Sequence, residues 1–251
     1  MFNFLNRILP QSVKQHLRPI LASKIISSKR LTRLIGLKYF GLNSLDQLIE
    51  PYIHSGSGYF VEIGANDGFT ASNTKHFELF HDWVGILIEP IPEQADLCRT
   101  HRKNKTQVFE AACVSFEYLA DSIDLLYSDT MTIALAGDSD ISNRAQHAES
   151  GIKFLPQGKS TYKFTAVAKT MTSILDEAKA PNVMQLLSLD VEGGELEVLK
   201  GIDHKKYYFE YIILESRDVN RISEYLTDHN YELVKRFGDH DYLYRSVKNP
   251  S

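Results

Sequence analysis

Hydrophobic positions change their spacing partway along the chain. In the segments 2–9 and 17–25, apolar side chains recur every three or four residues, which predicts short amphipathic helices. Later, runs rich in β-branched and aromatic residues cover 59–63, 84–89 and 107–111, with helical patterns between them. This β-α-β-α-β order predicts a parallel sheet whose strands are joined by helical crossovers.

The C-terminal half repeats the same alternation. It is predicted to contain the strands 184–190 and 211–215, the helices 194–201 and 219–229, and a terminal hairpin of 231–236 and 242–245. Between the halves, strands at 123–127 and 163–167 flank the polar span 128–160, which we expect to be a long mobile loop. The 251 residues suit one α/β domain of Rossmann-like architecture with a short appendage.

Charge is distributed unevenly along the chain. Residues 1–45 carry eight Lys or Arg and no acid, whereas the remainder carries 20 basic and 32 acidic residues. We therefore expect 1–45 to form a basic, amphipathic helical extension to a main domain at 46–251. Such an extension binds an anionic membrane surface, or packs against the acidic body of its own or a second chain. The acidic body argues against nucleic acid as a partner.

The expected location follows from what the sequence lacks. No apolar run approaches the roughly 20 residues that span a bilayer, and the first residues do not have the pattern of a secretory signal. Two cysteines, Cys98 and Cys113, are too few for a disulfide framework and indicate a reducing compartment. We expect a cytoplasmic protein, peripheral at the inner face of a membrane if the basic extension binds lipid.

The first candidate for chemistry is the segment Glu62-Ile-Gly-Ala-Asn-Asp-Gly68, between a predicted strand and a predicted helix. Its glycines allow a tight turn and close approach of the backbone to a ligand. The spacing differs from the dinucleotide and P-loop glycine patterns, so a pyrophosphate is not favoured. Glu89 ends the next strand, where a carboxylate accepts hydrogen bonds from a ribose diol. Together these residues predict a nucleoside site at the carboxyl ends of the strands.

Acidic residues also gather at the ends of two later strands. Asp190 and Glu192 follow one strand and Glu215 ends the next; a spacing of two points Asp190 and Glu192 the same way if the strand continues. These acids either share a proton, so that one acts as a general base, or bind Mg²⁺ through oxygen ligands. The alternative is structural: Glu192 and Glu195 stabilise the N-terminus of the helix that begins near Gly194.

Four segments of the sequence resemble the FkbM family of methyltransferases. They are FVEIGANDG at 60–68, IEP at 88–90, EAA at 110–112 and LDVEGGELEVLKG at 189–201. The last is the most specific, because its thirteen residues contain the family's D-x-E-G-x-E-x-x-x-L-x-G pattern. The resemblance covers about residues 57–246 and extends neither to the basic extension nor to a recognisable pattern within 128–160.

The resemblance implies a class I methyltransferase fold, with a mostly parallel seven-stranded sheet and helices on both faces. It also implies S-adenosylmethionine as methyl donor and, most often, a hydroxyl of a sugar, polyketide or similar metabolite as acceptor. Carried over by position, the residues placed against the donor are Glu62 at the methionine amine, Gly64, Asn66 and Gly68 along the methionine, Ser72 and Asn73 at its carboxylate, Glu89 with Pro90 and Ile91 at the ribose, and Glu110, Ala111 and Ala112 near the adenine.

We therefore expect an O-methyltransferase acting on a hydroxyl of a saccharide or glycan intermediate, with Asp190, Glu192 and Glu215 as catalytic residues. Two other functions stay open at this point: methyl transfer to a nitrogen or carboxyl group, and a non-catalytic Rossmann-like binding module. The intact turn at 62–68, Glu89 and Asp190 argue against the non-catalytic module. The residues do not decide between a metal-free base and Mg²⁺.

Overall fold

The structure is a computed structural model that describes residues 28–34, 36–53, 56–155 and 160–247. Its centre is a seven-stranded sheet with the order β10-β11-β9-β8-β1-β2-β3. The strands are β1 (Tyr59–Ile63), β2 (Val84–Ile88), β3 (Gln107–Phe109), β8 (Val183–Leu189), β9 (Tyr208–Glu215), β10 (Tyr231–Arg236) and β11 (Asp241–Ser246). The sheet is mixed: it is parallel from β3 through to β9, as predicted, whereas β11 runs antiparallel to both of its neighbours.

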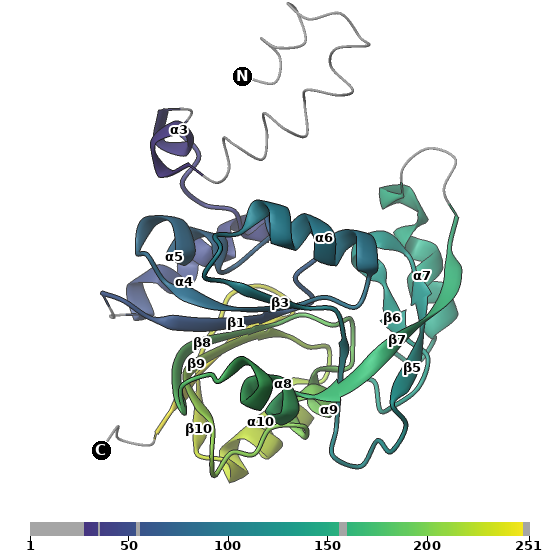
Figure 1. The fold of residues 1–251 in the computed structure, drawn as a ribbon. Coiled ribbons are helices and arrows are strands. Elements are labelled where there is room, and N and C mark those ends of the chain that lie inside the picture. Colours follow the sequence, from purple (N-terminus) through teal and green to yellow (C-terminus); the bar gives the residue numbers. More distant parts are fainter. Residues whose placement is uncertain (1–27, 35, 54–55, 156–159, 248–251) are drawn as a thin grey trace, which may run out of the picture.

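Helices cover both faces of this sheet (Figure 1). One face carries α4 (Leu45–Ile49), α5 (Lys75–Phe80) and α6 (Pro92–His101), and the other carries α8 (Met171–Ala178), α9 (Glu195–Leu199) and α10 (Val219–Asp228). Successive strand residues point to opposite faces, so in β1 Phe60 packs with the first group and Val61 with the second. The alternation builds an apolar core on each side and leaves the strand ends for polar residues.

A second, four-stranded sheet adjoins the first, with the order β4-β7-β5-β6. Its strands are β4 (Ala112–Val114), β5 (Ser122–Tyr127), β6 (Ile133–Ala134) and β7 (Tyr162–Thr170). The strands predicted at 123–127 and 163–167 are confirmed as β5 and part of β7, which pair antiparallel. Because β4 follows β3 closely in the chain, the small sheet lies beside that edge of the large one (Figure 1).

The span 128–160 contains more secondary structure than the predicted loop. Its described part holds η3 (Asp129–Met131), β6, α7 (Arg144–Ser150) and η4 (Gly151–Phe154). The interpretation of the whole span as a loop is therefore wrong there, because Ile133, Ile141 and Ala148 form a small buried apolar cluster that fixes these elements. The mobility of the span stays a prediction.

The helices predicted at 2–9 and 17–25 lie outside the described residues. The described part of the extension holds α3 (Lys29–Leu34) and η1 (Leu42–Ser44), and η2 (Glu50–Tyr52) follows α4. Leu45 and Ile49 are buried in the core that also holds Phe77 of α5, so the predicted domain boundary at residue 46 falls inside a packed segment. In the part of the chain that the structure describes, no helix has the length and apolar character needed to cross a bilayer.

Candidate functional site

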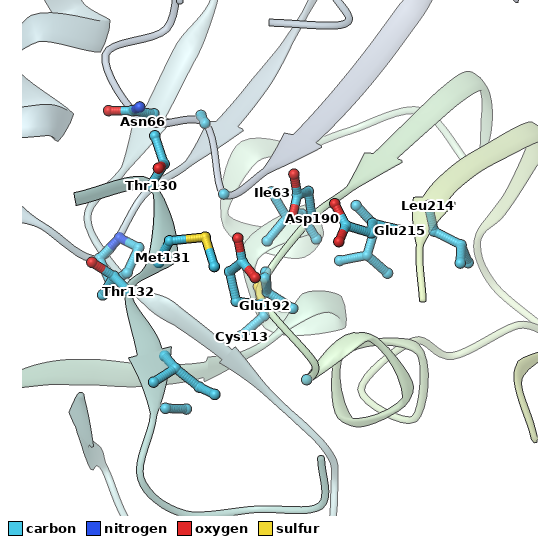
Figure 2. Close-up of a pocket in the computed structure, with 18 of the residues that line it drawn as sticks. Ile63, Asn66, Cys113, Thr130, Met131, Thr132, Asp190, Glu192, Leu214 and Glu215 are labelled. Carbon is cyan, nitrogen blue, oxygen red and sulfur yellow. The ribbon is translucent and has the colours of Figure 1, made fainter. Parts of the chain in front are cut away.

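A cavity of about 780 Å³ opens at the carboxyl ends of β1, β2, β8 and β9. Residues of the small sheet and of 129–139 form its other side, and Thr130, Met131 and Thr132 lie across from Asp190 and Glu192 (Figure 2). Ligands of open α/β sheets bind at this end of the strands. All of the predicted site residues except Gly68 and Glu110 line the cavity.

Gly68 and Glu110 lie outside the cavity lining. Gly68 has a φ of +73°, and a Cβ atom there would come within 3.1 Å of the Cα of Cys98 in α6. Its role is therefore to let the turn pack against α6. The Glu110 side chain is 43% exposed and lies 3.8 Å from Arg99. The contacts with a methyl donor predicted for these two residues do not fit these positions.

The turn after β1 crosses the end of β8 at very short distance. Gly64 has a φ of +75°, and a Cβ atom there would lie 1.8 Å from the carbonyl oxygen of Asp190, so only glycine fits. Asn66 also adopts the left-handed conformation, with a φ of +47°, which asparagine tolerates better than most residues. This turn brings the backbone at 64–66 and Asp190 to the same cavity.

Glu62 is buried, and its carboxylate accepts four hydrogen bonds from the chain itself. Oε1 accepts the Asn73 backbone N–H at 2.8 Å, and Oε2 accepts the hydroxyls of Ser72 at 2.9 Å and Thr74 at 2.7 Å. Arg102, at the end of α6, donates to Oε2 at 2.6 Å through a side chain that is 1% exposed. Glu62 and Ser72 therefore fasten the loop that borders the cavity, and Arg102 is a member of this network that the sequence analysis missed.

Asn73 lines the cavity and links the loop after β1 to β8. Its side-chain nitrogen donates to the Ser188 hydroxyl at 3.1 Å, which fixes the orientation of the amide. The amide oxygen is buried and has no hydrogen-bond partner within the described residues. This oxygen packs against Gly41, where an added Cβ atom would lie 2.7 Å from it, so it faces the protein and not the open cavity.

Glu89 lies at the end of β2, where the sequence predicts a ribose-binding carboxylate. It is 4% exposed, and its oxygens accept the backbone N–H groups of Asn66 at 2.8 Å and Ile91 at 2.9 Å. Burial raises the pKa of Glu89 to about 7, and these two amides oppose that rise. Each oxygen keeps a lone pair for a further donor, as binding of a diol requires. Pro90, Ile91, Ala111 and Ala112 also line the cavity.

Asp190, Glu192 and Glu215 meet on the cavity floor (Figure 2). The Asp190 side chain faces the open space of the cavity yet is enclosed by protein on its other sides. Burial, reinforced by the nearby charges of Glu215 and Asp241, raises the pKa of Asp190 well above its usual range. Burial and the charges of Asp190 and Glu215 raise the pKa of Glu192 further, and burial also raises that of Glu215. Asp241, which pairs with Glu215 across β9 and β11, belongs to this group but was not predicted.

Two basic residues that the sequence analysis did not assign to a site border this acid cluster. Arg217 Nη2 lies 3.3 Å from Glu215 Oε1 and 3.6 Å from Glu192 Oε2. His147 of α7 places its Nε2 2.8 Å from Glu192 Oε2, but out of line for a hydrogen bond, so both atoms lack a hydrogen-bond partner. Burial, with the charge of Arg217, lowers the pKa of His147. Because His147 and Arg217 are far from Glu192 in the sequence, no local sequence pattern indicates these contacts.

The loop between β8 and α9 holds Glu192 in a strained conformation. Glu192 has a φ of +55° and Gly193 a φ of +95°, and a non-glycine residue in this region costs on the order of 1 kcal/mol. Buried Glu195 stabilises the loop by accepting the backbone N–H groups of Val191 at 3.0 Å and Gly193 at 3.2 Å. Of the two acids that the alternative interpretation placed at the helix N-terminus, Glu195 has a structural role, because it binds backbone N–H groups of the preceding loop. Glu192 instead lines the cavity.

Asp140 ties the 128–160 span to the strand ends. Its carboxylate accepts the Ser216 hydroxyl at 3.0 Å and the Arg217 backbone N–H at 2.6 Å. Its own N–H donates to the carbonyl oxygen of Gly193 at 3.1 Å. These bonds join three segments around Glu192 and Arg217, which is why this polar span is part of the site.

The acids of the cavity do not form a compact cation site. Among the described residues, no three of these carboxylates bring oxygen atoms within 4.8 Å of one another. A Mg²⁺ ion needs near-ideal octahedral oxygen ligands at about 2.0–2.1 Å. Because Mg²⁺ commonly binds through one or two carboxylates and completes its shell with water, the choice between proton transfer and a metal stays open, as it was in the sequence.

One comparison with known proteins identifies a family for this chain. The sequence profile of the Methyltransferase FkbM domain matches residues 62–239. No curated protein matches the chain in sequence. Similar solved structures include a human methyltransferase 10 domain containing protein, with 11% identity, a TM-score of 0.45 and coverage of 92% of this chain and 97% of that chain.

Two further structures have similar values. A putative caffeoyl-CoA O-methyltransferase from Staphylococcus aureus has 10% identity, a TM-score of 0.44 and coverage of 93% and 98% of the two chains. A precorrin-6y C5,15-methyltransferase from Geobacter metallireducens has 15% identity, a TM-score of 0.42 and coverage of 80% and 85%. The profile match, by contrast, spans well over half of the chain and includes both the turn at 64–66 and the acid cluster. The chain belongs to the FkbM family of S-adenosylmethionine-dependent methyltransferases.

Proposed function

We propose that the protein transfers a methyl group from S-adenosylmethionine to a hydroxyl of a saccharide or glycan intermediate. The observation that carries the proposal is the acid cluster of Asp190, Glu192 and Glu215, whose pKa values are raised. It shares one cavity with Glu89 and the turn at 64–66. A nucleoside site beside groups that can exchange protons is what methyl transfer to a hydroxyl requires.

The residues on the β1–β2 side fit the donor. The Glu89 carboxylate can accept two ribose hydroxyls, because each of its oxygens has only one hydrogen bond within the chain. Pro90, Ile91 and Ala112 offer an apolar surface for a flat base. When bound, S-adenosylmethionine supplies a methyl group on a positively charged sulfur.

Asp190 is the general base in this proposal. The acceptor oxygen forms its bond to the methyl carbon as the carbon–sulfur bond breaks, and Asp190 takes the hydroxyl proton. A sugar hydroxyl is a weak nucleophile near neutral pH, and a carboxylate whose pKa is raised toward that range is an efficient base. Glu192 keeps its proton at the same pH, because its pKa is raised further, and can donate a hydrogen bond to the acceptor.

The side of the cavity opposite the acids fits a polyhydroxylated acceptor. Thr130 supplies a hydroxyl group and Asp129 a carboxylate. The Asp138 carboxylate also lines this side but is paired with Arg221. Met131 and Phe154 add apolar surface on this side of the cavity, against which the apolar face of a sugar ring can pack. The volume of about 780 Å³ accommodates a nucleoside-sized donor together with part of an acceptor.

The basic extension supports a further part of the proposal, which concerns place and partners. Eight positive charges in residues 1–45 favour contact with an anionic membrane surface at its cytoplasmic face, where lipid-linked glycan intermediates would be met. Self-association through the same residues is the alternative. Co-sedimentation with anionic vesicles tests this, and removal of residues 1–38, which carry all eight charges, should abolish binding. If the full chain stays in the supernatant at low salt, membrane binding fails and self-association remains.

The reaction itself is tested with isotopically labelled S-adenosylmethionine and a panel of free and lipid-linked saccharides. The expected product is a labelled methyl ether, which survives mild alkali and is located on the sugar by mass spectrometry. A label that mild alkali releases would indicate a methyl ester, and a label on an amine would indicate N-methyl transfer. Either result would replace the hydroxyl acceptor while leaving the donor site intact.

A further inference from the structure

Three potential metal ligands converge outside the cavity. Glu50 begins η2, His76 belongs to α5, and His81 directly follows α5. Glu50 Oε1 lies 3.0 Å from His76 Nε2 and 3.2 Å from His81 Nε2, and the two Nε2 atoms are 3.2 Å apart. The three donor atoms thus form a nearly equilateral triangle, which we name the His–Glu cluster. None of its members lines the large cavity.

Hydrogen bonding elsewhere on the His76 ring turns a lone pair toward Glu50, whose carboxylate also has the Lys38 ammonium 3.3 Å from Oε2 at the surface. His76 Nδ1 lies 3.0 Å from the backbone carbonyl oxygen of Lys38, which can only accept, so Nδ1 carries the hydrogen. In the neutral ring, Nε2 therefore presents a lone pair to Glu50 Oε1, which is also an acceptor. A second proton on His76 Nε2 would form a hydrogen bond with either Glu50 or His81. A metal ion would accept lone pairs from Glu50, His76 and His81 together.

We propose that Glu50, His76 and His81 bind a divalent transition metal, with Zn²⁺ the best fit. Zinc takes imidazole nitrogen and carboxylate oxygen at about 2.0–2.2 Å, which in a tetrahedron separates neighbouring ligand atoms by about 3.3–3.4 Å. The observed separations of 3.0–3.2 Å need only a small adjustment. Imidazole ligands disfavour Mg²⁺ and Ca²⁺, which prefer oxygen alone.

The surroundings of the His–Glu cluster are those of a metal site. Metal-binding histidines commonly donate their other N–H to a backbone carbonyl, as His76 does to Lys38. The second Glu50 oxygen accepts the Tyr39 hydroxyl at 2.6 Å, which orients the carboxylate. His76 is fully buried, but the side chains of His81 and Glu50 are 34% and 25% exposed, so an ion can enter from solvent.

A small cavity adjoins the cluster and leaves room for a fourth ligand. It has a volume of about 420 Å³, and Glu50 and His81 line it together with Gly36, Leu37 and Lys38. A water molecule there would complete a tetrahedron around the ion. Three protein ligands beside a cavity form an open metal site, whereas structural zinc sites are closed by four protein ligands.

The proposed metal would connect two parts of the chain that are distant in sequence. The ion would join η2 to α5, and its orienting partners Lys38 and Tyr39 would be held with them. The segment between these anchors carries Leu42, Asn43 and Leu45, which line the large cavity. Metal binding would therefore stabilise one wall of the methyltransferase cavity without any part in the chemistry, so the inference goes beyond the proposed function.

The test uses the full-length protein without a polyhistidine tag, dialysed against a chelator and then titrated with Zn²⁺ by calorimetry. We expect one tightly bound ion per chain and a rise in melting temperature on addition of Zn²⁺. His81→Ala should weaken binding by roughly 100-fold or more, and Tyr39→Phe, which removes only an orienting partner, by about 10- to 100-fold. His229→Ala is the matched control, because His229 is also half-buried but lies beyond α10 and should leave Zn²⁺ affinity unchanged.

A second measurement keeps the test independent of variant folding. Co²⁺ bound to the wild-type protein should give the intense visible absorption of a tetrahedral site, and Zn²⁺ should displace it. Weak binding of Zn²⁺ by the wild type, or equal affinities in the wild type and His81→Ala, would overturn the proposal. The close approach of His76 to Glu50 would then be explained by a proton between them. Binding of S-adenosylhomocysteine measured on the same samples reports the proposed function separately.

Discussion

The carboxylates on the two sides of the cavity are held in different ways. Glu62 and Glu89, on the β1–β2 side, accept hydrogen bonds from Arg102, from hydroxyls and from backbone amides. Asp190 and Glu192, on the β8–β9 side, have mainly one another and further acids as neighbours, with Arg217 as a cation nearby.

This difference separates binding from chemistry. A buried carboxylate with enough donors stays in place and keeps its geometry, whereas one surrounded by acids lowers its cost by holding a proton. The pKa of Glu89 is also raised to about 7, but two backbone N–H groups fix its oxygens. The Asp190 and Glu192 carboxylates, in contrast, lie side by side and can pass a proton, as general acid–base catalysis requires. The β1–β2 side is therefore suited to hold a ligand, and the β8–β9 side to move a proton.

The largest effect is expected from Asp190→Asn, which keeps the shape of the side chain and removes the base. Turnover should fall by roughly 10²–10⁴, measured as S-adenosylhomocysteine released in the presence of the acceptor. Asp239→Asn is the matched control, because Asp239 also lines the cavity but its side chain is 96% exposed. Equal turnover in the two variants would return Asp190 to a structural role.

A second change tests the contact that joins the two sides. Gly64→Ala would drive a Cβ atom into the carbonyl oxygen of Asp190 and force alanine into the left-handed region. We expect the free energy of unfolding to fall by roughly 2–4 kcal/mol, from overpacking and backbone strain together. Gly56→Ala is the control, since no atom lies within 4 Å of its added Cβ. Similar denaturation midpoints for both variants would show that the turn can move away from β8.

The smallest effect concerns pH and the binding side. The pKa of Glu89 is raised to about 7, and hydroxyl donors of a ligand favour its ionised form. Affinity for S-adenosylhomocysteine should therefore rise by about tenfold between pH 6 and pH 8 and level off above that. The Glu89→Gln variant should lose this dependence. Calorimetry that finds affinity falling with pH in the wild type would contradict the assignment of Glu89 to a diol.

Local sequence patterns predicted the main sheet because its strands are continuous apolar runs that end in glycine or acid. Glu89 and Asp190 each follow such a run directly, and the carboxyl ends of parallel strands lie at one edge of a sheet, so both could be placed there. The elements within 128–160 were missed because Ile141 and Ala148 are isolated among polar residues and the apolar run at 133–136 is too short to show a period. Helix α8 was also missed, although its apolar residues at 171, 174, 175 and 178 have helical spacing.

Contacts between distant residues account for the rest of the site. Arg102 meets Glu62 across 40 positions of sequence, and His147 and Arg217 reach Glu192 from different elements. Nothing in the local period of α6 or α7 marks these side chains as functional. Only the packing of the helices and the small sheet against the strand ends brings them to the cavity.

The most direct test of the division between binding and chemistry needs no acceptor. Calorimetry at pH 8 compares S-adenosylhomocysteine binding to the wild type, Glu89→Gln and Asp190→Asn. Loss of the charge-assisted bonds of Glu89 should weaken affinity by about 5- to 150-fold, equivalent to about 1–3 kcal/mol. Asp190→Asn should bind within about twofold of the wild type, since its role is in the later transfer step. Unchanged affinity in Glu89→Gln together with a large loss in Asp190→Asn would contradict the account.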